Sequence, residues 1–271
     1  MSKRNIRLVA SDLDGTILRN GAQSCDPEIF PLIKELLDLG IYFVPASGRQ
    51  YASQQRLFKP IKEELTYLSD NGSLVTHLDQ ILYKKSFEDD LAMELCQAIV
   101  EHPDCEVLIS GERTCYVIPK KSEFARHLVE DVGNHITIIK SPLQIEEPIL
   151  KISFYTESQN QKRVETEFAP RFANRAVMMT SGTEWIDFAP LGTNKGSALK
   201  AIGELLGIAP EEMMAFGDNE NDKAMLEMVG YPYIMDPCNP RIEHLKGKRC
   251  TKVEPVLREL IQEIKADRND K

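Results

Sequence analysis

The spacing of hydrophobic residues predicts the first structural unit of the chain. Residues 6–10 are mostly apolar and indicate a short buried strand. Residues 28–39 carry apolar side chains every three to four positions, as in an amphipathic helix, and Gly40 is suited to end it. Residues 41–44 are continuously apolar, which is typical of a strand buried on both faces. Strand, helix and strand in this order predict a parallel βαβ unit.

The same alternation of strands and helices returns further along the chain. A helix is expected at 51–58 and a strand at 66–69. After residue 187 the pattern predicts, in order, a helix at 195–206, a strand at 213–216, a helix at 222–228, a strand at 231–235 and a closing helix from 255. This order predicts an α/β fold with a Rossmann-like parallel-sheet core. Helices would cover both faces of the sheet in a three-layer α/β/α arrangement.

Residues 84–186 have a different character. Helical and strand-like segments alternate there without the parallel pattern, and they show no catalytic constellation of their own. We therefore expect a core formed by residues 1–83 and 187–271, with an inserted α+β domain over 84–186.

Composition and charge narrow the classes of function. The net charge is −9 and no long run of Lys and Arg occurs, so no nucleic-acid partner is expected. No apolar run approaches the ~18 residues that span a membrane, and the N-terminus lacks the apolar segment of a secretory signal. The six cysteines form no Cys-x-x-Cys pair and do not cluster with histidines, so no zinc site is expected. We expect a cytoplasmic protein without a membrane partner, either a monomer or a homodimer.

Polar residues stand where the predicted parallel strands end. Asp12 and Asp14 follow the first strand, Ser47 and Gly48 follow the second, and Asp218 follows the strand at 213–216. Ligands of open α/β sheets bind at the carboxyl ends of the strands, which share one edge. Asp12 and Asp14 alone are also compatible with an ordinary acidic turn, because Asp-Gly is a common turn dipeptide.

These separate signals indicate one chemistry when they are combined. Three or more carboxylates that converge on one edge need a cation, and oxygen ligands favour Mg²⁺. Lys195 begins a predicted helix, where a cation opposes the helix dipole, and this inconsistency is typical of a functional site. A hydroxyl, backbone amides and a lysine beside a metal can hold a dianion. The set indicates phosphoryl transfer through an aspartyl-phosphate.

Four segments resemble the motifs of the haloacid dehalogenase superfamily, in their usual order. They are Asp12–Thr16, Ser47–Arg49, Thr193–Gly196 and Gly217–Asp222. The insertion between the second and third motifs resembles the α/β cap of the Cof-type phosphatases. The segment Met235–Asn239 departs from the Met-Gly-Asn-Ala sequence usual in Cof-type proteins, so the resemblance implies no role for this loop.

The resemblance implies a role for each acidic residue. Asp12 would be the nucleophile and also a metal ligand. Asp14 would protonate the leaving alcohol, activate water afterwards, and bind Mg²⁺ through its main-chain carbonyl. Asp218 would bind Mg²⁺, and Asp222 would hold the metal or Lys195.

The resemblance also implies a phosphate-binding set. Ser47 would hydrogen-bond the transferring phosphoryl group, assisted by the amide of Gly48. Lys195 would neutralise charge between the nucleophile and the phosphate, and Asn221 would support the phosphate side.

The resulting prediction is a Mg²⁺-dependent phosphatase that hydrolyses a small phosphorylated metabolite, with a sugar phosphate as the first choice. A phosphomutase with the same aspartyl chemistry is the nearest alternative. A non-catalytic binding protein on this core is the second alternative, although the presence of Asp12 argues against it. Cap residues would set the substrate, and the sequence offers only the 110–114 turn and Trp185 as candidates.

Overall fold

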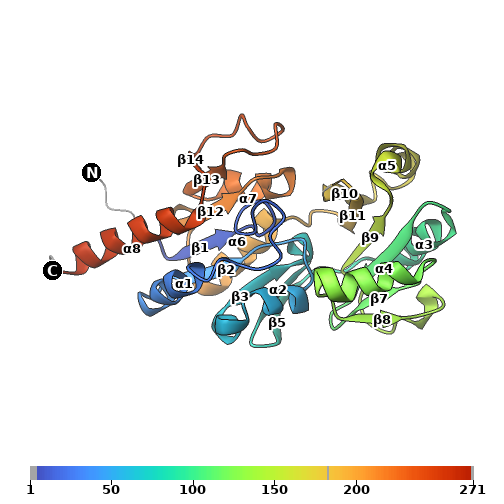
Figure 1. Ribbon diagram of the computed structural model, residues 1–271, viewed down its shortest axis with the longest axis horizontal. Helices are drawn as coiled ribbons and strands as arrows, with labels where there is room; N and C mark the ends of the chain where they lie inside the picture. Colours follow the sequence, from blue (N-terminus) through green and yellow to red (C-terminus); the bar gives the residue numbers. More distant parts are fainter. Residues whose placement is uncertain (1–4, 182, 270–271) are drawn as a thin grey trace.

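The computed structural model describes residues 5–181 and 183–269, and their strands form a parallel core sheet and a second sheet beside it (Figure 1). The core sheet has five parallel strands in the spatial order β14 (Lys248–Cys250), β13 (Tyr231–Met235), β12 (Met213–Gly217), β1 (Leu8–Ser11) and β2 (Tyr42–Pro45). The predicted Rossmann-like parallel core is confirmed.

Helices cover both faces of this sheet. The apolar side chains of α1 (Ile29–Asp38) and α8 (Val253–Asn269) pack with Val9 and Phe43 on one face. Those of α6 (Lys195–Leu206) and α7 (Lys223–Met228) pack with Leu8 and Ala10 on the other. Neighbouring residues of β1 therefore enter different halves of the core, which is why residues 8–10 are all apolar.

A hairpin extends the core beyond β2. Helix α2 (Tyr51–Leu57) and the 3₁₀ helix η1 (Lys59–Glu64) lead to β3 (Thr66–Ser69), which meets β2 through a parallel bridge between Ala46 and Leu68. The antiparallel strands β4 (Leu74–His77) and β5 (Gln80–Lys84) follow β3. The strand at 66–69 was predicted correctly, whereas the two strands of the hairpin were not predicted.

The second sheet belongs to the inserted part of the chain, which we call the cap. Its six strands lie in the order β10 (Ala176–Ser181), β11 (Trp185–Pro190), β9 (Lys151–Tyr155), β6 (Glu106–Ser110), β7 (Cys115–Val117) and β8 (Ile136–Ile138). Helices α3 (Asp89–Glu101) and α5 (Ser158–Phe172) pack on one face. The short helix α4 (Ser122–His127) and the turn at Leu128–Val132 pack against the other.

The predicted boundary between residues 186 and 187 falls inside β11. This strand pairs with β10 as far as Pro190, so residues 187–190 lie in the cap sheet and not in the core as expected. The apolar run around Trp185 continues through both halves of the strand, and it carries no local signal of a boundary. We propose that the chain returns to the core at residues 191–194, directly before α6.

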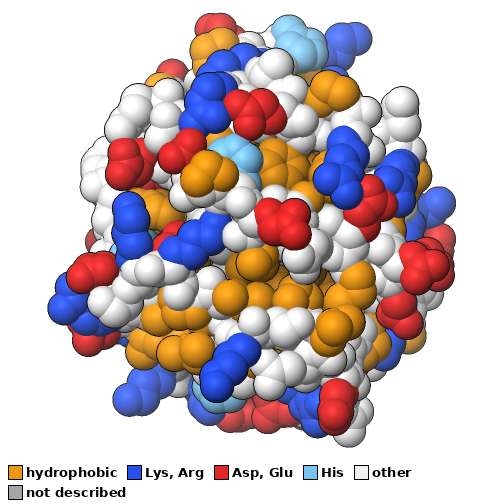
Figure 2. Space-filling view, turned by 90° about the vertical axis from the view of Figure 1, so that its right-hand side faces the viewer, with side chains coloured by type: hydrophobic (Ala, Val, Ile, Leu, Met, Phe, Trp, Pro, Cys, Tyr) orange, Lys and Arg blue, Asp and Glu red, His pale blue; other side chains and the backbone are white. Residues whose placement is uncertain are grey.

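The surface carries charges of both signs. Figure 2, which looks onto the right-hand end of Figure 1, shows Lys and Arg interspersed with Asp and Glu around small hydrophobic areas. Among the described residues, no helix is long and apolar enough to cross a membrane. All six cysteines have free thiols.

Candidate active site

Asp12 lies at the carboxyl end of β1, which is between β12 and β2 in the core sheet, and is almost fully buried. The loop after it turns at Gly15, whose φ of +92° suits glycine. A Cβ atom on Gly15 would lie 2.3 Å from a carboxylate oxygen of Asp218, so glycine also permits this close approach. Thr16 donates a hydrogen bond from Oγ1 to Asp218 Oδ1 over 3.1 Å. The loops after β1 and β12 are therefore locked together.

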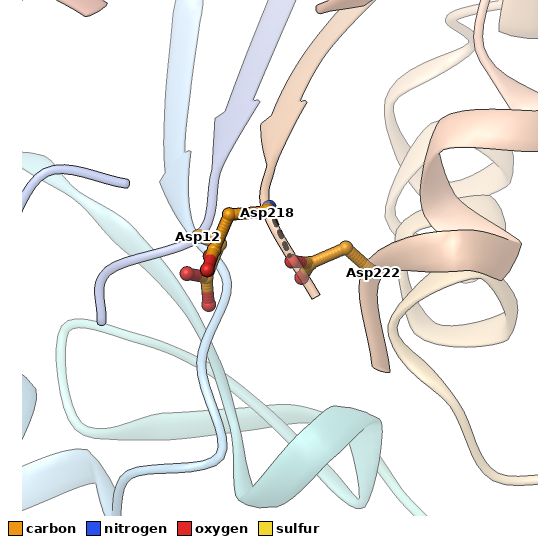
Figure 3. A group of neighbouring side chains, drawn as sticks. All are labelled: Asp12, Asp218 and Asp222. Carbon is orange, nitrogen blue, oxygen red and sulfur yellow. Dashed lines mark hydrogen bonds between the residues drawn. The ribbon is translucent and has the colours of Figure 1, made fainter. Parts of the chain in front are cut away.

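Three carboxylates converge at this edge of the sheet. Asp12, Asp218 and Asp222 each offer an oxygen, and these oxygens lie within 4.8 Å of one another (Figure 3). The backbone amides of Asp218 and Asn219 donate hydrogen bonds to Asp222 Oδ2 over 2.9 and 3.0 Å, and the first of these is drawn in the figure. The predicted convergence of Asp12, Asp218 and Asp222 is present in the structure.

Lys195 lies fully buried between two of these acids. Its Nζ donates to Asp12 Oδ1 over 2.5 Å and to Asp222 Oδ1 over 2.6 Å. Burial alone would lower the pKa of Lys195, but the charges of Asp12 and Asp222 raise it above its ordinary value. This explains why a lysine begins α6 against the helix dipole: its partners are buried carboxylates. Since both oxygens of Asp222 have partners, Asp222 positions Lys195 and the loop in the structure.

The electrostatics of the cluster favour a bound cation. Burial and the charge of Asp222 raise the pKa of Asp12 well above its ordinary value and that of Asp218 to about 6. Three carboxylates face one buried ammonium, and Asp12 Oδ2 is buried without a hydrogen-bond partner among the described residues. This cluster of hard oxygen ligands, in which three carboxylates outnumber the one ammonium, fits Mg²⁺.

We expect Mg²⁺ to stabilise the protein in a pH-dependent way. Mg²⁺ binds ionised carboxylates, and Asp218, whose pKa is about 6, is ionised at pH 7.5 and mostly protonated at pH 5. A ligand that binds only the folded protein raises its Tm, and the rise is larger when the ligand binds more tightly. The increase in Tm on adding Mg²⁺ should therefore be several degrees larger at pH 7.5 than at pH 5. Differential scanning calorimetry measures it.

The matched variants make this test specific. Asp218→Asn should lose most of the Mg²⁺-dependent rise in Tm. Glu220→Gln, in the same loop but with an exposed side chain that pairs with Arg241, should keep it. An equal rise at both pH values, or a full rise in Asp218→Asn, would contradict a metal site at this cluster.

Asp14 is not a member of the three-carboxylate cluster. Its side chain is 55% exposed, and its two oxygens accept hydrogen bonds of 2.7 and 2.8 Å from the guanidinium of Arg49. The metal contact predicted for Asp14 was through its main-chain carbonyl, and that contact stays a prediction. Arg49 belongs to the second motif, and no role was predicted for it.

Three of the four predicted phosphate-binding residues meet at one cavity, whereas Lys195 does not line it. Ser47, Gly48 and Asn221 line it together with Asp12 and Asp14, and its volume is about 390 Å³. Ser47 is buried and its Oγ accepts a hydrogen bond of 3.1 Å from the amide of Arg49.

Asn71, which the sequence analysis did not single out, connects two of these loops. Its Oδ1 accepts a hydrogen bond of 3.1 Å from Asn221 Nδ2. A Cβ atom on Gly48 would lie 3.0 Å from the same oxygen. Asn71 therefore holds the loops after β2 and β12 at a fixed distance.

The cap contributes Lys151, for which no role was predicted, to this cavity. Lys151 on β9 is buried, 3.2 Å from Asp70 Oδ1 of the core and 3.8 Å from Asp187 Oδ2 of β11. Its Nζ also donates to the carbonyl of Gly48 over 2.5 Å. Burial would lower the pKa of Lys151, but Asp187 and Asp70 raise it above its ordinary value. Lys151 thus ties the cap sheet to the second motif.

Signals for these residues are present in the sequence. Asp70 follows the strand at 66–69, and the rule that identified Asp12 applies to it equally. Asp70 and Asn71 also adopt positive φ angles of 51° and 57°, an arrangement that Asp and Asn tolerate better than most residues. Lys151 and Asp187 each interrupt an apolar strand, and a single charge inside such a strand indicates a buried partner.

The comparison with known families agrees with this geometry. A family model of haloacid dehalogenase-like hydrolases matches residues 9–250, which includes all four motifs. The chain belongs to the haloacid dehalogenase-like hydrolases. The predicted family and the predicted class of enzyme, a hydrolase, are confirmed.

Several proteins of this family are similar to the chain over most of its length. A 5-amino-6-(5-phospho-D-ribitylamino)uracil phosphatase of Escherichia coli strain K12 is 23% identical, over 86% of each chain. An HMP-PP phosphatase of Serratia proteamaculans is 28% identical, over 88% of this chain and 87% of the relative. The crystal structure of a haloacid dehalogenase-like hydrolase from Bacteroides thetaiotaomicron matches with a TM-score of 0.80 at 18% identity, over 94% of this chain and 99% of that one. The last similarity concerns the fold.

The atypical segment Met235–Asn239 of this hydrolase supports the fourth motif. The amide of Asn239 donates to the carbonyl of Asp218 over 2.7 Å, and its Nδ2 donates to Asn219 Oδ1 over 2.7 Å. Asn239 does not line the cavity. The segment therefore positions the loop that carries Asp218.

Proposed function

We propose that this hydrolase is a Mg²⁺-dependent phosphatase that acts on a small phosphorylated metabolite through an aspartyl-phosphate on Asp12. One observation supports it above the others. Asp12 lines the cavity with one oxygen fixed by Lys195 and the other, Oδ2, buried without a partner among the described residues. A carboxylate oriented in this way has one oxygen available for attack on phosphorus.

In the first step, Asp12 Oδ2 forms a bond to phosphorus while the bond from phosphorus to the ester oxygen breaks. Lys195 beside Asp12 stabilises the negative charge that gathers there. Ser47, the amide of Gly48 and Asn221 would hold the phosphoryl oxygens. Mg²⁺ bound by Asp12, Asp218 and the Asp14 carbonyl would neutralise further charge and orient the phosphoryl group.

Proton transfer falls to Asp14 in this proposal. The alcohol leaves with a proton from Asp14, and the ionised Asp14 then takes a proton from the water that attacks the aspartyl-phosphate. In the structure Arg49 holds both carboxylate oxygens of Asp14, so neither is free to meet the leaving alcohol. Arg49 must therefore release Asp14 before the first step, and the phosphoryl dianion supplies a competing partner for its guanidinium.

The relatives support a phosphorylated metabolite as the substrate. Two of them are named as phosphatases of small phosphorylated compounds. A cavity of about 390 Å³ is of the size that accommodates such a compound.

Release of free phosphate from a panel of phosphorylated metabolites and p-nitrophenyl phosphate tests the proposal. With Mg²⁺ we expect hydrolysis of p-nitrophenyl phosphate and of at least one metabolite, and removal of the metal by EDTA should reduce the rate by at least about 100-fold, because the site then lacks its charge neutralisation. An isomerised sugar phosphate without free phosphate would identify a phosphomutase instead. Absence of both products would favour a binding protein and overturn the proposal.

A further inference from the structure

The cavity also has an end that faces the cap, and the proposed chemistry does not use the residues that line it. Core and cap both contribute to it, through Asp70, Ser110, Asn134, Lys151 and Asp187. Apolar side chains complete this wall, and they are Leu108, Leu128, Val132 and Trp185. In a phosphatase, whose phosphoryl group lies at Asp12, this end would surround the leaving group.

Two buried oxygens at this end have no hydrogen-bond partner among the described residues. They are Asp70 Oδ2 and Asn134 Oδ1. Asp70 is completely buried and Asn134 is 8% exposed. A buried polar atom without a partner is rare in folded proteins and destabilises them, so each one requires an explanation. Asp12 Oδ2 is the third unpartnered oxygen lining the cavity, and the proposed chemistry accounts for it.

Both oxygens are acceptors, and both need a donor. Asp70 Oδ1 already accepts from Ser110 Oγ over 2.9 Å and lies 3.2 Å from Lys151 Nζ, which leaves only Oδ2 available. The carboxylate of Asp187 is occupied in a similar way, by Ser153 and Asn71. A ligand that satisfies Asp70 and Asn134 must therefore carry hydroxyl or amino groups.

The charges at the cavity exclude a second anionic group on the ligand. Among the described residues that line it, the cations are Arg49 and Lys151. Arg49 is paired with Asp14, and Lys151 lies between Asp70 and Asp187. A second phosphate or a carboxylate on the leaving group would meet carboxylates without a free cation, which is strongly unfavourable in a buried site.

We infer that Asp70 and Asn134 select the leaving group, and that this group is uncharged and rich in hydroxyl donors, as in a sugar or polyol monophosphate. This inference rests on the proposed phosphatase function and adds the residues that set its specificity. Trp185 and Leu128 would cover the apolar face of the carbon chain, while Asp70 and Asn134 accept hydrogen bonds from its hydroxyls.

Matched substrates test the inference on the full-length protein with Mg²⁺. Hydroxylated esters (glucose 6-phosphate, fructose 6-phosphate and ribitol 5-phosphate) are compared with hexyl and pentyl phosphate, and with fructose 1,6-bisphosphate. We expect kcat/KM of the best hydroxylated monophosphate to exceed that of the alkyl phosphates and of the bisphosphate by at least about 10-fold, since each unpaired acceptor left by an alkyl chain is costly.

The variants locate this preference. Asn134→Leu should reduce the ratio of kcat/KM between hydroxylated and alkyl phosphates by about 10- to 100-fold, and Asn134→Asp, which keeps an acceptor, should retain most of it. Thr156→Val is the control, because Thr156 Oγ1 is also buried and unpartnered but lies outside this cavity. Its ratio should match the wild type.

Three results would overturn the inference. They are a preference for alkyl phosphates, a preference for the bisphosphate, and an unchanged ratio in Asn134→Leu. If p-nitrophenyl phosphate is hydrolysed in any of these cases, the phosphatase function stands and only the specificity is wrong. If no ester is hydrolysed, the proposed function itself fails, and the inference with it.

Discussion

Asp12→Asn is expected to reduce phosphatase activity by at least about 10⁴-fold while the protein stays folded. An amide oxygen does not form the phosphoryl bond, and the other oxygen of Asp12 is the one held by Lys195. Lys195 keeps its second partner, Asp222, so the buried ammonium is not left alone. Release of phosphate from p-nitrophenyl phosphate measures the loss, and circular dichroism with a cooperative thermal transition reports the fold.

A second substitution controls for the loss of a carboxylate as such. Asp38→Asn removes an exposed carboxylate at the end of α1, outside the cavity, and should keep wild-type activity. Substantial turnover in Asp12→Asn would rule out Asp12 as the nucleophile. Loss of the thermal transition would instead show that Asp12 is needed for folding.

Lys195→Met is expected to reduce both activity and stability. It leaves the carboxylates of Asp12 and Asp222 buried without their shared cation, a change that typically costs about 3–5 kcal/mol in the free energy of unfolding. Activity should fall by at least about 10³-fold, because the charge that stabilises the attacking group is lost. Urea denaturation and the phosphate assay measure the two effects.

The stability deficit of Lys195→Met should grow with pH. Burial already raises the pKa of Asp12 in the folded state, and removal of the ammonium raises it further. The folded variant therefore binds protons that the unfolded chain has released above about pH 4, so its free energy of unfolding falls as pH rises from 5 to 8.

Lys200→Met removes an exposed lysine from the same helix and should change the free energy of unfolding by less than about 0.5 kcal/mol. A loss of stability in Lys195→Met that does not change with pH, or that equals the loss in Lys200→Met, would contradict the buried cluster.

The core and its motifs could be predicted from the sequence because the patterns that indicate them are local. The first, second and fourth motifs each follow an apolar strand of the core sheet, and parallel strands bring their carboxyl ends to one edge whatever their exact register. The convergence of Asp12, Ser47 and Asp218 at one edge therefore follows from the parallel strands, whereas Lys195 comes after β11 of the cap sheet. The unusual position of Lys195 at a helix start was informative for the same reason: it required a buried partner.

The cap side of the site depends on contacts that local patterns do not contain. Lys151 lies opposite Ser110 in the antiparallel pairing of β9 with β6, and Asp187 lies opposite Ser153 in the pairing of β11 with β9. These registers connect segments about 35 to 40 residues apart, and a shift of one residue would turn each side chain to the other face. A single charged residue in a strand can also lie on a face exposed to water. Only the strand pairing shows that Lys151 and Asp187 are buried and face the cavity.

Asp14 illustrates a different limit. Its place in the loop directly after β1 can be read from the sequence. Its pairing with Arg49 depends on where the loop after β2 lies. The sequence therefore located this residue without its ion-pair partner.

Trapping the covalent intermediate is the direct test of Asp12 as the nucleophile. In Asp14→Asn, p-nitrophenyl phosphate still phosphorylates the enzyme because p-nitrophenolate leaves without a proton, whereas hydrolysis of the intermediate lacks its base. Phosphate binding should stay largely intact in this variant.

Rapid mixing followed by borohydride reduction, which converts an aspartyl-phosphate to homoserine, and by peptide mass spectrometry locates the phosphoryl group. We predict a burst of about one equivalent of p-nitrophenolate and homoserine at position 12. A phosphorylated residue elsewhere, or hydrolysis without any covalent intermediate, would contradict the proposed aspartyl-phosphate on Asp12.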